Sequence, residues 1–227
     1  MKKILAALGF SLAVGCTNLP KPKPEPKDPK PSGEVGIVFL VGTTARCSYY
    51  RPTLDYWAGQ GYKIGCPATN KTANGEACLM EISKMKSQWP GIRLGIAGHS
   101  QGGGASFICA SKAEQRWGEK FPILGIEPAH GFKYGGSFLT AYKGIQSPSF
   151  QWYGTLDTLV SKSWVKYGYS ILPAGDKYIY GAVGARHIQL PFRWMNESVH
   201  FFDWKLKDSK DAKQKFLSLP TFRHWEK

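Results

Sequence analysis

The chain has few acidic residues, few cysteines and no long apolar run, and each shortage excludes a class of protein. Of 227 residues, 16 are Asp or Glu against 30 Lys or Arg, which gives a formal net charge of +14. The five cysteines are too few for a disulfide-dense scaffold, and the cysteines and histidines do not fall at zinc-site spacing. No internal repeat is present, and the length suits one domain with a sizeable core.

The beginning of the chain predicts export. Met1–Lys3 carries positive charge, and Ile4–Val14 is an apolar run too short to span a bilayer, as in a signal peptide. The ending Leu12–Cys16 resembles a bacterial lipobox, although Ala13 stands where a leucine is usual. We therefore expect a signal peptide over 1–15 and lipid attachment at Cys16. This makes the protein an exported bacterial lipoprotein, anchored in the envelope at the outer membrane or cell surface. An ordinary secretory signal is the alternative.

The sequence predicts a linker over residues 16–33 and a single catalytic domain over residues 34–227. The segment Thr17–Ser32 alternates proline with charge, so it cannot bury a core and should form an extended spacer. A proline-rich ligand for a partner domain is the alternative reading. Six lysines and two acidic residues precede Gly33, so most of the positive charge lies on the domain. Such a surface suits anionic lipids or polysaccharides, whereas no motif for binding nucleic acid accompanies it.

The domain alternates strand patterns with helix patterns. This alternation predicts an α/β fold with a mostly parallel sheet of about six strands, helices on both faces and no obvious lid. Strands are expected at Glu34–Gly42, Tyr62–Cys66, Leu94–Ala97, Ile123–Glu127, Phe150–Tyr153 and Lys177–Tyr180. Helices are expected at Tyr49–Ala58, Ala77–Gln88, Ser100–Glu114 and Glu197–Lys207, the last with a basic continuation toward Leu217.

The most informative stretch is Gly98–Gly102, which reads G-H-S-Q-G after a short apolar run. A G-x-S-x-G sequence between a strand and a helix is typical of the turn that presents a nucleophilic serine in hydrolases. Glycines are needed there because strand and helix nearly touch. Ser100 is the candidate nucleophile, and the Gln101 N–H at the helix start is a candidate oxyanion donor. A glycine-rich turn with an incidental serine is the alternative.

An acid and a base are expected downstream of the serine. Asp157 lies just beyond the strand Phe150–Tyr153, where a carboxylate can orient an imidazole, although aspartate also favours turns and helix caps. Asp176 and Asp203 lie at worse places in the strand order. His187 follows the last strand on a glycine-bearing loop and is the candidate base. Of the other histidines, His99 neighbours the serine and His130 precedes the acid. His200 lies in an apolar helix, and His224 lies near the chain end.

The second oxyanion donor should come from the loop after the first strand. The backbone N–H of Thr43 is the candidate, with Thr44 as the alternative.

Four cysteines remain if Cys16 is lipidated: Cys47, Cys66, Cys78 and Cys109. An even number in an oxidising compartment permits disulfides, with three pairings if all four bond. Cys66 ends an expected strand and Cys78 begins the next helix, so a Cys66–Cys78 bridge is one expectation. Free buried cysteines are the alternative.

With these pieces placed, the chain resembles the α/β-hydrolase superfamily, and within it the bacterial cutinase-like polyester hydrolases and dienelactone-hydrolase-type esterases. The resemblance covers about 34–216. It rests on Gly42–Arg46, Gly98–Gly104, Leu156–Asp157, the His187 loop and the helix around Phe201–Lys205. Thr43 stands where those polyester hydrolases usually carry an aromatic residue, Gln101 stands where they carry methionine, and no antiparallel strands precede the first strand.

The resemblance implies a serine carboxylic-ester hydrolase that needs no metal or cofactor and acts on a small-molecule or polymeric ester. Because an aromatic platform is missing at Thr43, we expect short acyl chains and not solid polyester. The protein is expected to be monomeric, and activity to fall on acidification through about pH 6–7 as a histidine of ordinary pKa protonates. An acyltransferase or thioesterase with the same triad, and a non-catalytic envelope-binding lipoprotein on this scaffold, are the alternatives.

Overall fold

A computed structural model describes residues 33–68, 74–130, 137–193 and 195–219. The expected signal peptide, Cys16, His224 and all of the expected linker except Gly33 lie outside these residues. Within them, no helix has the length and apolar character needed to cross a bilayer.

The centre of the molecule is a six-stranded sheet in which every pair of neighbouring strands is parallel. The strand order is β2-β1-β3-β4-β5-β6. The strands are β1 Val35–Leu40, β2 Lys63–Gly65, β3 Arg93–His99, β4 Ile123–Ile126, β5 Ser149–Gly154 and β6 Lys177–Ala182. All six carboxyl ends therefore meet at one edge, where loops from different strands come together. The expected α/β class and the number of strands are confirmed.

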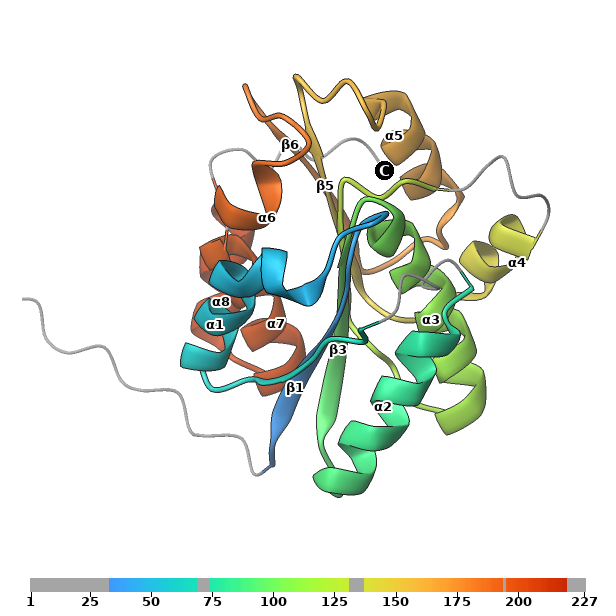
Figure 1. Cartoon of the computed structure of the whole chain (residues 1–227), viewed down its shortest axis with the longest axis vertical. Coiled ribbons are helices and arrows are strands. Elements are labelled where there is room, and N and C mark those ends of the chain that lie inside the picture. The colour runs from blue at the N-terminus through green and yellow to red at the C-terminus, as the bar shows by residue number, and fades with distance from the viewer. Residues whose placement is uncertain (1–32, 69–73, 131–136, 194, 220–227) are drawn as a thin grey trace, which may run out of the picture.

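Helices cover both faces of the sheet (Figure 1). In the figure α1, α6, α7 and α8 lie on one side, and α2, α3, α4 and α5 on the other. Their bounds are α1 Arg51–Gly59, α2 Glu76–Gln88, α3 Gln101–Trp117, α4 Ser137–Gly144, α5 Lys162–Ile171, α6 Leu190–Arg193, α7 Met195–Lys207 and α8 Lys210–Leu217. A short 3-10 turn, Cys47–Tyr50, leads into α1.

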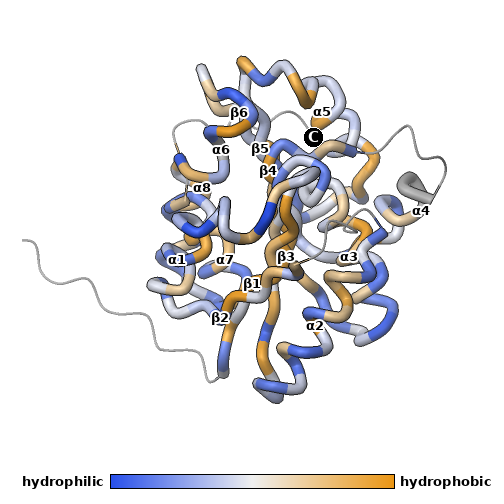
Figure 2. The backbone as a smooth tube through the Cα atoms, in the orientation of Figure 1, coloured by the Kyte–Doolittle hydropathy of each residue, from blue (hydrophilic) through white to orange (hydrophobic). Residues whose placement is uncertain are grey.

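Two apolar cores lie on the two faces, and the strands between them appear as apolar tubes in Figure 2. The side chains of β1 alternate between these cores. Ile37 and Phe39 join the aromatic cluster under α1, α7 and α8, and Val38 and Leu40 join the aliphatic cluster under α2 and α3. A strand buried on both faces reads as a continuous apolar run, which is why β1 is so evident in the sequence.

Three helices, α4, α5 and α6, have no counterpart among the expected elements. Helix α5 begins at Ser161, whose hydroxyl accepts a hydrogen bond from the Ser163 N–H in the manner of an N-cap. Val165 and Gly168 of this helix are buried whereas Trp164 and Tyr167 are exposed, so its largest side chains do not mark the face that packs on the sheet. The basic continuation after α7 is a separate helix, α8. Asp208 precedes it in a left-handed backbone conformation, and Ser209 is its N-cap.

The expected Cys66–Cys78 bridge is wrong. The disulfides are Cys47–Cys66 and Cys78–Cys109, each with Cα atoms 6.1 Å apart. The first joins the loop after β1 to the end of β2, and the second joins α2 to α3. Parallel pairing places β1 and β2 side by side, so the loops at their carboxyl ends are neighbours although they are distant in sequence.

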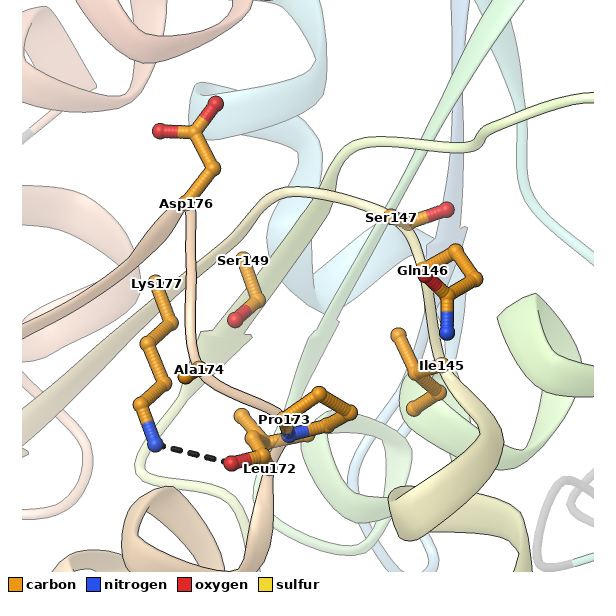
Figure 3. A pocket seen from close by; sticks show the side chains of 9 residues that line it. All are labelled: Ile145, Gln146, Ser147, Ser149, Leu172, Pro173, Ala174, Asp176 and Lys177. Atoms are coloured by element: carbon orange, nitrogen blue, oxygen red, sulfur yellow. Dashed lines mark hydrogen bonds between the residues drawn. The ribbon is translucent and has the colours of Figure 1, made fainter.

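A pocket lies at the opposite end of the sheet from the G-x-S-x-G turn. It is formed where β5 and β6 begin, and Figure 3 shows Lys177 reaching back to the carbonyl of Leu172 across it. The hydrogen bond is 2.8 Å long. The polar groups that line this pocket, including Asp176, are therefore remote from the sheet edge that carries the candidate site.

Candidate active site

Ser100 is the single residue between β3 and α3. Its backbone has φ 55° and ψ −120°, a conformation that residues with side chains rarely adopt. The end of β4 and the loop that follows it hold the serine through two backbone hydrogen bonds. The Ser100 N–H donates to the Ile126 carbonyl, and the Ser100 carbonyl accepts from the Ala129 N–H, both at 2.9 Å. This is the sharp strand-to-helix turn that the motif predicts for a nucleophile.

The glycines of the turn are required by close backbone approach. A Cβ at Gly98 would overlap the carbonyl group of Gly102, and a Cβ at Gly102 would overlap the carbonyl group of Leu40. Gly42 is also close, since a Cβ built there would lie 3.4 Å from that of Ser100. The loop after β1 therefore lies directly against the serine.

Asp157 and His187 follow the neighbouring strands β5 and β6 and meet at the same sheet edge. His187 Nδ1 lies 2.8 Å from Asp157 Oδ2, and the backbone N–H groups of Leu159 and Val160 donate to Asp157 Oδ1 at 2.7 and 3.0 Å. The two loops are joined by a backbone hydrogen bond from Leu156 to Ala185. An aspartate held in this way fixes the orientation of the imidazole.

The serine and the histidine are close but not bonded to each other. The ring of His187 packs 4.7 Å from the ring of His99, the residue before Ser100. In the described part of the chain, the Ser100 hydroxyl makes no hydrogen bond with His187. Catalytic hydrogen bonds are often long without substrate and tighten when it binds.

The pattern did not single out Glu127, which also reaches His187. Its side chain is fully buried, and Oε2 lies 3.0 Å from His187 Nδ1. The residue follows β4, the strand between those of the serine and Asp157. An acidic residue at the end of an otherwise apolar run, Ile123–Glu127, is the sequence signal that could have found it.

The two carboxylates change the proton affinity of the site. Burial alone would lower the pKa of His187, but hydrogen bonds and charge from Asp157 and Glu127 outweigh it and raise the pKa to about 9. Burial would raise the pKa of Asp157. Its hydrogen bonds with His187 and with the N–H groups of Val160 and Leu159 outweigh burial and lower that pKa. The site thus stabilises a protonated imidazole beside an ionised aspartate.

The candidate oxyanion donors come from two adjacent loops. The Thr43 hydroxyl donates to Gln101 Oε1 at 3.2 Å, which ties the loop after β1 to the start of α3. Thr44 turns away, with φ 60° and its hydroxyl on the Thr43 carbonyl. The backbone N–H groups of Thr43 and Gln101 make no hydrogen bond to an acceptor among the described residues, so both are free to donate to a substrate oxygen.

His99 has a structural role that its position in the motif did not reveal. The Gly42 N–H donates to the Tyr50 hydroxyl at 3.2 Å, and that hydroxyl lies 2.8 Å from His99 Nδ1. Since the hydroxyl oxygen accepts from Gly42, its proton is available for Nδ1, which leaves Nε2 to donate. His99 Nε2 lies 3.0 Å from the His187 carbonyl oxygen. His99 therefore links the loop after β1 to the histidine loop.

The weaker candidates lie elsewhere. His130 is buried beside Tyr142 and Gln151, and desolvation lowers its pKa to about 4 despite the hydrogen bond with Gln151. His200 is half-buried on α7. Asp176 pairs with Lys205, and Asp203 contacts Tyr62 and Lys207.

One group of side chains has the composition of a metal site. Ligand atoms of His99, Glu127 and His187 all lie within 4.8 Å of one another. Both nitrogens of His99 are already held, by Tyr50 and by the His187 carbonyl, and His187 Nδ1 faces Asp157. The group therefore serves hydrogen bonding within the site.

Comparison with known proteins supports the fold but does not identify the reaction. No protein-family model matches the chain, and no curated protein matches it either. Among solved structures, one similar to it is described as a predicted CIB-like hydrolase from Thermoplasma acidophilum. The TM-score is 0.58 at 17% identity, over 75% of this chain and 87% of that one. The chain therefore shares its fold, a parallel α/β sheet covered by helices on both faces, with that protein.

Proposed function

We propose that the protein is a serine carboxylic-ester hydrolase. The observation that carries this proposal is the strained turn at Ser100 on the same sheet edge as the His187–Asp157 hydrogen bond of 2.8 Å. In this mechanism His187 Nε2 takes the proton of the Ser100 hydroxyl as it attacks the ester carbonyl. Asp157 holds Nδ1–H and stabilises the imidazolium that forms.

The remaining steps use the same groups. The Thr43 and Gln101 N–H groups bind the oxyanion, His187 returns its proton to the leaving alkoxide, and the alcohol departs. Water, deprotonated by His187, then attacks the acyl-enzyme; the acid is released as His187 returns that proton to the Ser100 oxygen. Each intermediate needs only protons that His187 has just accepted, so the cycle is balanced without a cofactor.

Apolar side chains near the site favour an apolar ester. Tyr49 follows the loop after β1, Leu156 and Leu159 flank Asp157, and Ile188 follows His187; all four are exposed. Each buried methylene contributes about 0.8 kcal/mol, so even partial cover from these side chains favours acyl chains over charged groups. We propose short acyl esters as substrates, because Thr43 provides no aromatic surface for stacking.

The first test is covalent labelling and turnover with Ser100→Ala. A fluorophosphonate probe should label the wild-type protein at Ser100 and leave the variant unlabelled. Hydrolysis of p-nitrophenyl acetate and butyrate should fall by about 10⁴-fold or more, as expected for loss of a triad member. Ser170→Ala, an exposed serine on α5, is the matched control and should keep full activity. Wild-type turnover by folded Ser100→Ala would overturn the assignment.

A further inference from the structure

Glu127 has a backbone conformation that places its side chain inside the site. Its φ is +43°, in the left-handed region that residues other than glycine rarely adopt. Its N–H donates to the Trp152 carbonyl at 2.8 Å, so the unusual conformation is fixed against β5. Its carboxylate is completely buried.

The two carboxylate oxygens of Glu127 have different partners. Oε1 accepts a hydrogen bond of 2.9 Å from the Gly154 N–H, at the end of the strand that leads to Asp157. Oε2 has no hydrogen-bond partner among the described residues. The groups it approaches are His187 Nδ1 at 3.0 Å and His99 Nε2 at 3.7 Å.

A buried carboxylate oxygen without a hydrogen-bond donor is costly unless a positive charge faces it. Both ring nitrogens of His99 have other partners, since Nδ1 lies 2.8 Å from the Tyr50 hydroxyl and Nε2 lies 3.0 Å from the His187 carbonyl oxygen. His187 can, because its Nδ1 faces both Asp157 Oδ2 at 2.8 Å and Glu127 Oε2 at 3.0 Å. The same ring proton is therefore within reach of two carboxylates from two different strands.

We propose that Glu127 is a second positioning carboxylate of the site, whose Oε2 faces Nδ1 of His187 beside Asp157 and can hold the imidazole when Asp157 is removed. This inference rests on the proposed function, since it assigns His187 as the base. The groups that face the ring are Asp157 from the β5 loop, Glu127 from the β4 loop and His99 from β3, with Tyr50 behind His99.

The central experiment compares Asp157→Asn, Glu127→Gln and the double variant. Glu127→Gln keeps an oxygen for the Gly154 N–H, and its new amide can donate to Asp157. Removal of the only acid of a triad costs about 10⁴-fold in kcat. We expect Asp157→Asn to retain at least tenfold more activity than the double variant, which should show the full loss. Asp176→Asn, at the opposite end of the sheet, is the control and should match wild type.

The pH profile separates a positioning role from a purely structural one. Removing one of two carboxylates beside His187 should move the acid limb of kcat/KM in Glu127→Gln to lower pH by about one unit or more. Glu127→Ala should shift it in the same direction. An unchanged limb in both variants, or an Asp157→Asn variant as inactive as the double, would overturn the proposal.

A measurement without substrate keeps the two proposals distinguishable. NMR titration of histidine-labelled protein reports the pKa of His187 directly, and it should fall in Glu127→Gln whatever the reaction. If Ser100 resists fluorophosphonate and esters are not hydrolysed while this shift is seen, the esterase proposal fails and the pairing of Glu127 with His187 stands. If the His187 titration is the same in both proteins, the pairing itself is wrong.

Discussion

Ser100 and Glu127 both have left-handed backbone conformations, with φ of 55° and 43°, at the ends of neighbouring strands. Each such residue costs about 1–3 kcal/mol, which the surrounding structure must offset. The offset comes from the adjacent strand in both cases. The Ser100 N–H bonds to Ile126, and the Glu127 N–H bonds to Trp152. The two strained residues thus aim a hydroxyl and a carboxylate toward one edge.

The pH dependence follows from His187. Its folded-state pKa is raised to about 9, above the ordinary value, by Asp157 and Glu127 against the effect of burial. Only the neutral imidazole acts as base, so kcat/KM should rise with pH through about 9 and not level off above pH 6–7. A pH–rate profile with a short-chain p-nitrophenyl ester, corrected for spontaneous hydrolysis, measures this. A plateau already reached at pH 7.5 would contradict the raised pKa.

The strand-turn-helix unit β3–Ser100–α3 depends on backbone approach more than on side-chain packing. Strand β3 pairs with β1 and β4 along most of their length. The first turn of α3 lies against the loops that follow β1 and β4. One carbon atom added to a glycine of this unit would therefore displace several elements at once.

Gly98→Ala tests this unit. The new Cβ would overlap the carbonyl of Gly102, which is backbone and cannot rotate away, so we expect a loss of about 3 kcal/mol or more in the free energy of unfolding. Urea unfolding measures the change. Gly59→Ala is the control, because a Cβ at Gly59 meets nothing within 4 Å; it should be neutral or stabilise by up to about 1 kcal/mol. Equal stabilities of the two variants would show that the turn can relax.

For the whole molecule, the sheet edge that carries the candidate site lies at the opposite end of the strands from the start of β1. Residue 35 begins β1 at the edge opposite Ser100, so the chain that precedes it leaves from the far side of the domain. If Cys16 is lipidated, as the sequence predicts, the tether reaches the domain at the amino end of β1.

Cys16→Ala tests this tether. Loss of the lipid should release the protein from the membrane fraction or leave it unprocessed when it is expressed in a bacterium, while hydrolysis by the purified domain stays unchanged. Cell fractionation and intact mass measure both effects. Cys78→Ala, which removes a disulfide cysteine of the domain, is the control and should leave fractionation as in wild type. An unchanged mass and location of Cys16→Ala would exclude lipidation there.

The sequence by itself determined the features that depend on local pattern. The alternation of apolar runs with helix patterns predicts a parallel sheet. The sequence G-H-S-Q-G predicts the turn, because its glycines and the change from strand to helix pattern lie within a few residues of one another. Asp157 and His187 could be assigned because the ends of parallel strands share one edge. Helices such as α5 were missed because few of their residues are buried.

The tertiary structure decided what depends on which distant residues meet. Cys47 pairs with Cys66 because β1 and β2 are neighbours, which spacing along the chain does not encode. Glu127 reaches His187 because β4 lies between the strands of the serine and the acid, and because a left-handed backbone turns its side chain inward. Neither strand order nor such a backbone angle follows from composition or periodicity, since both are set by the packing of the whole sheet.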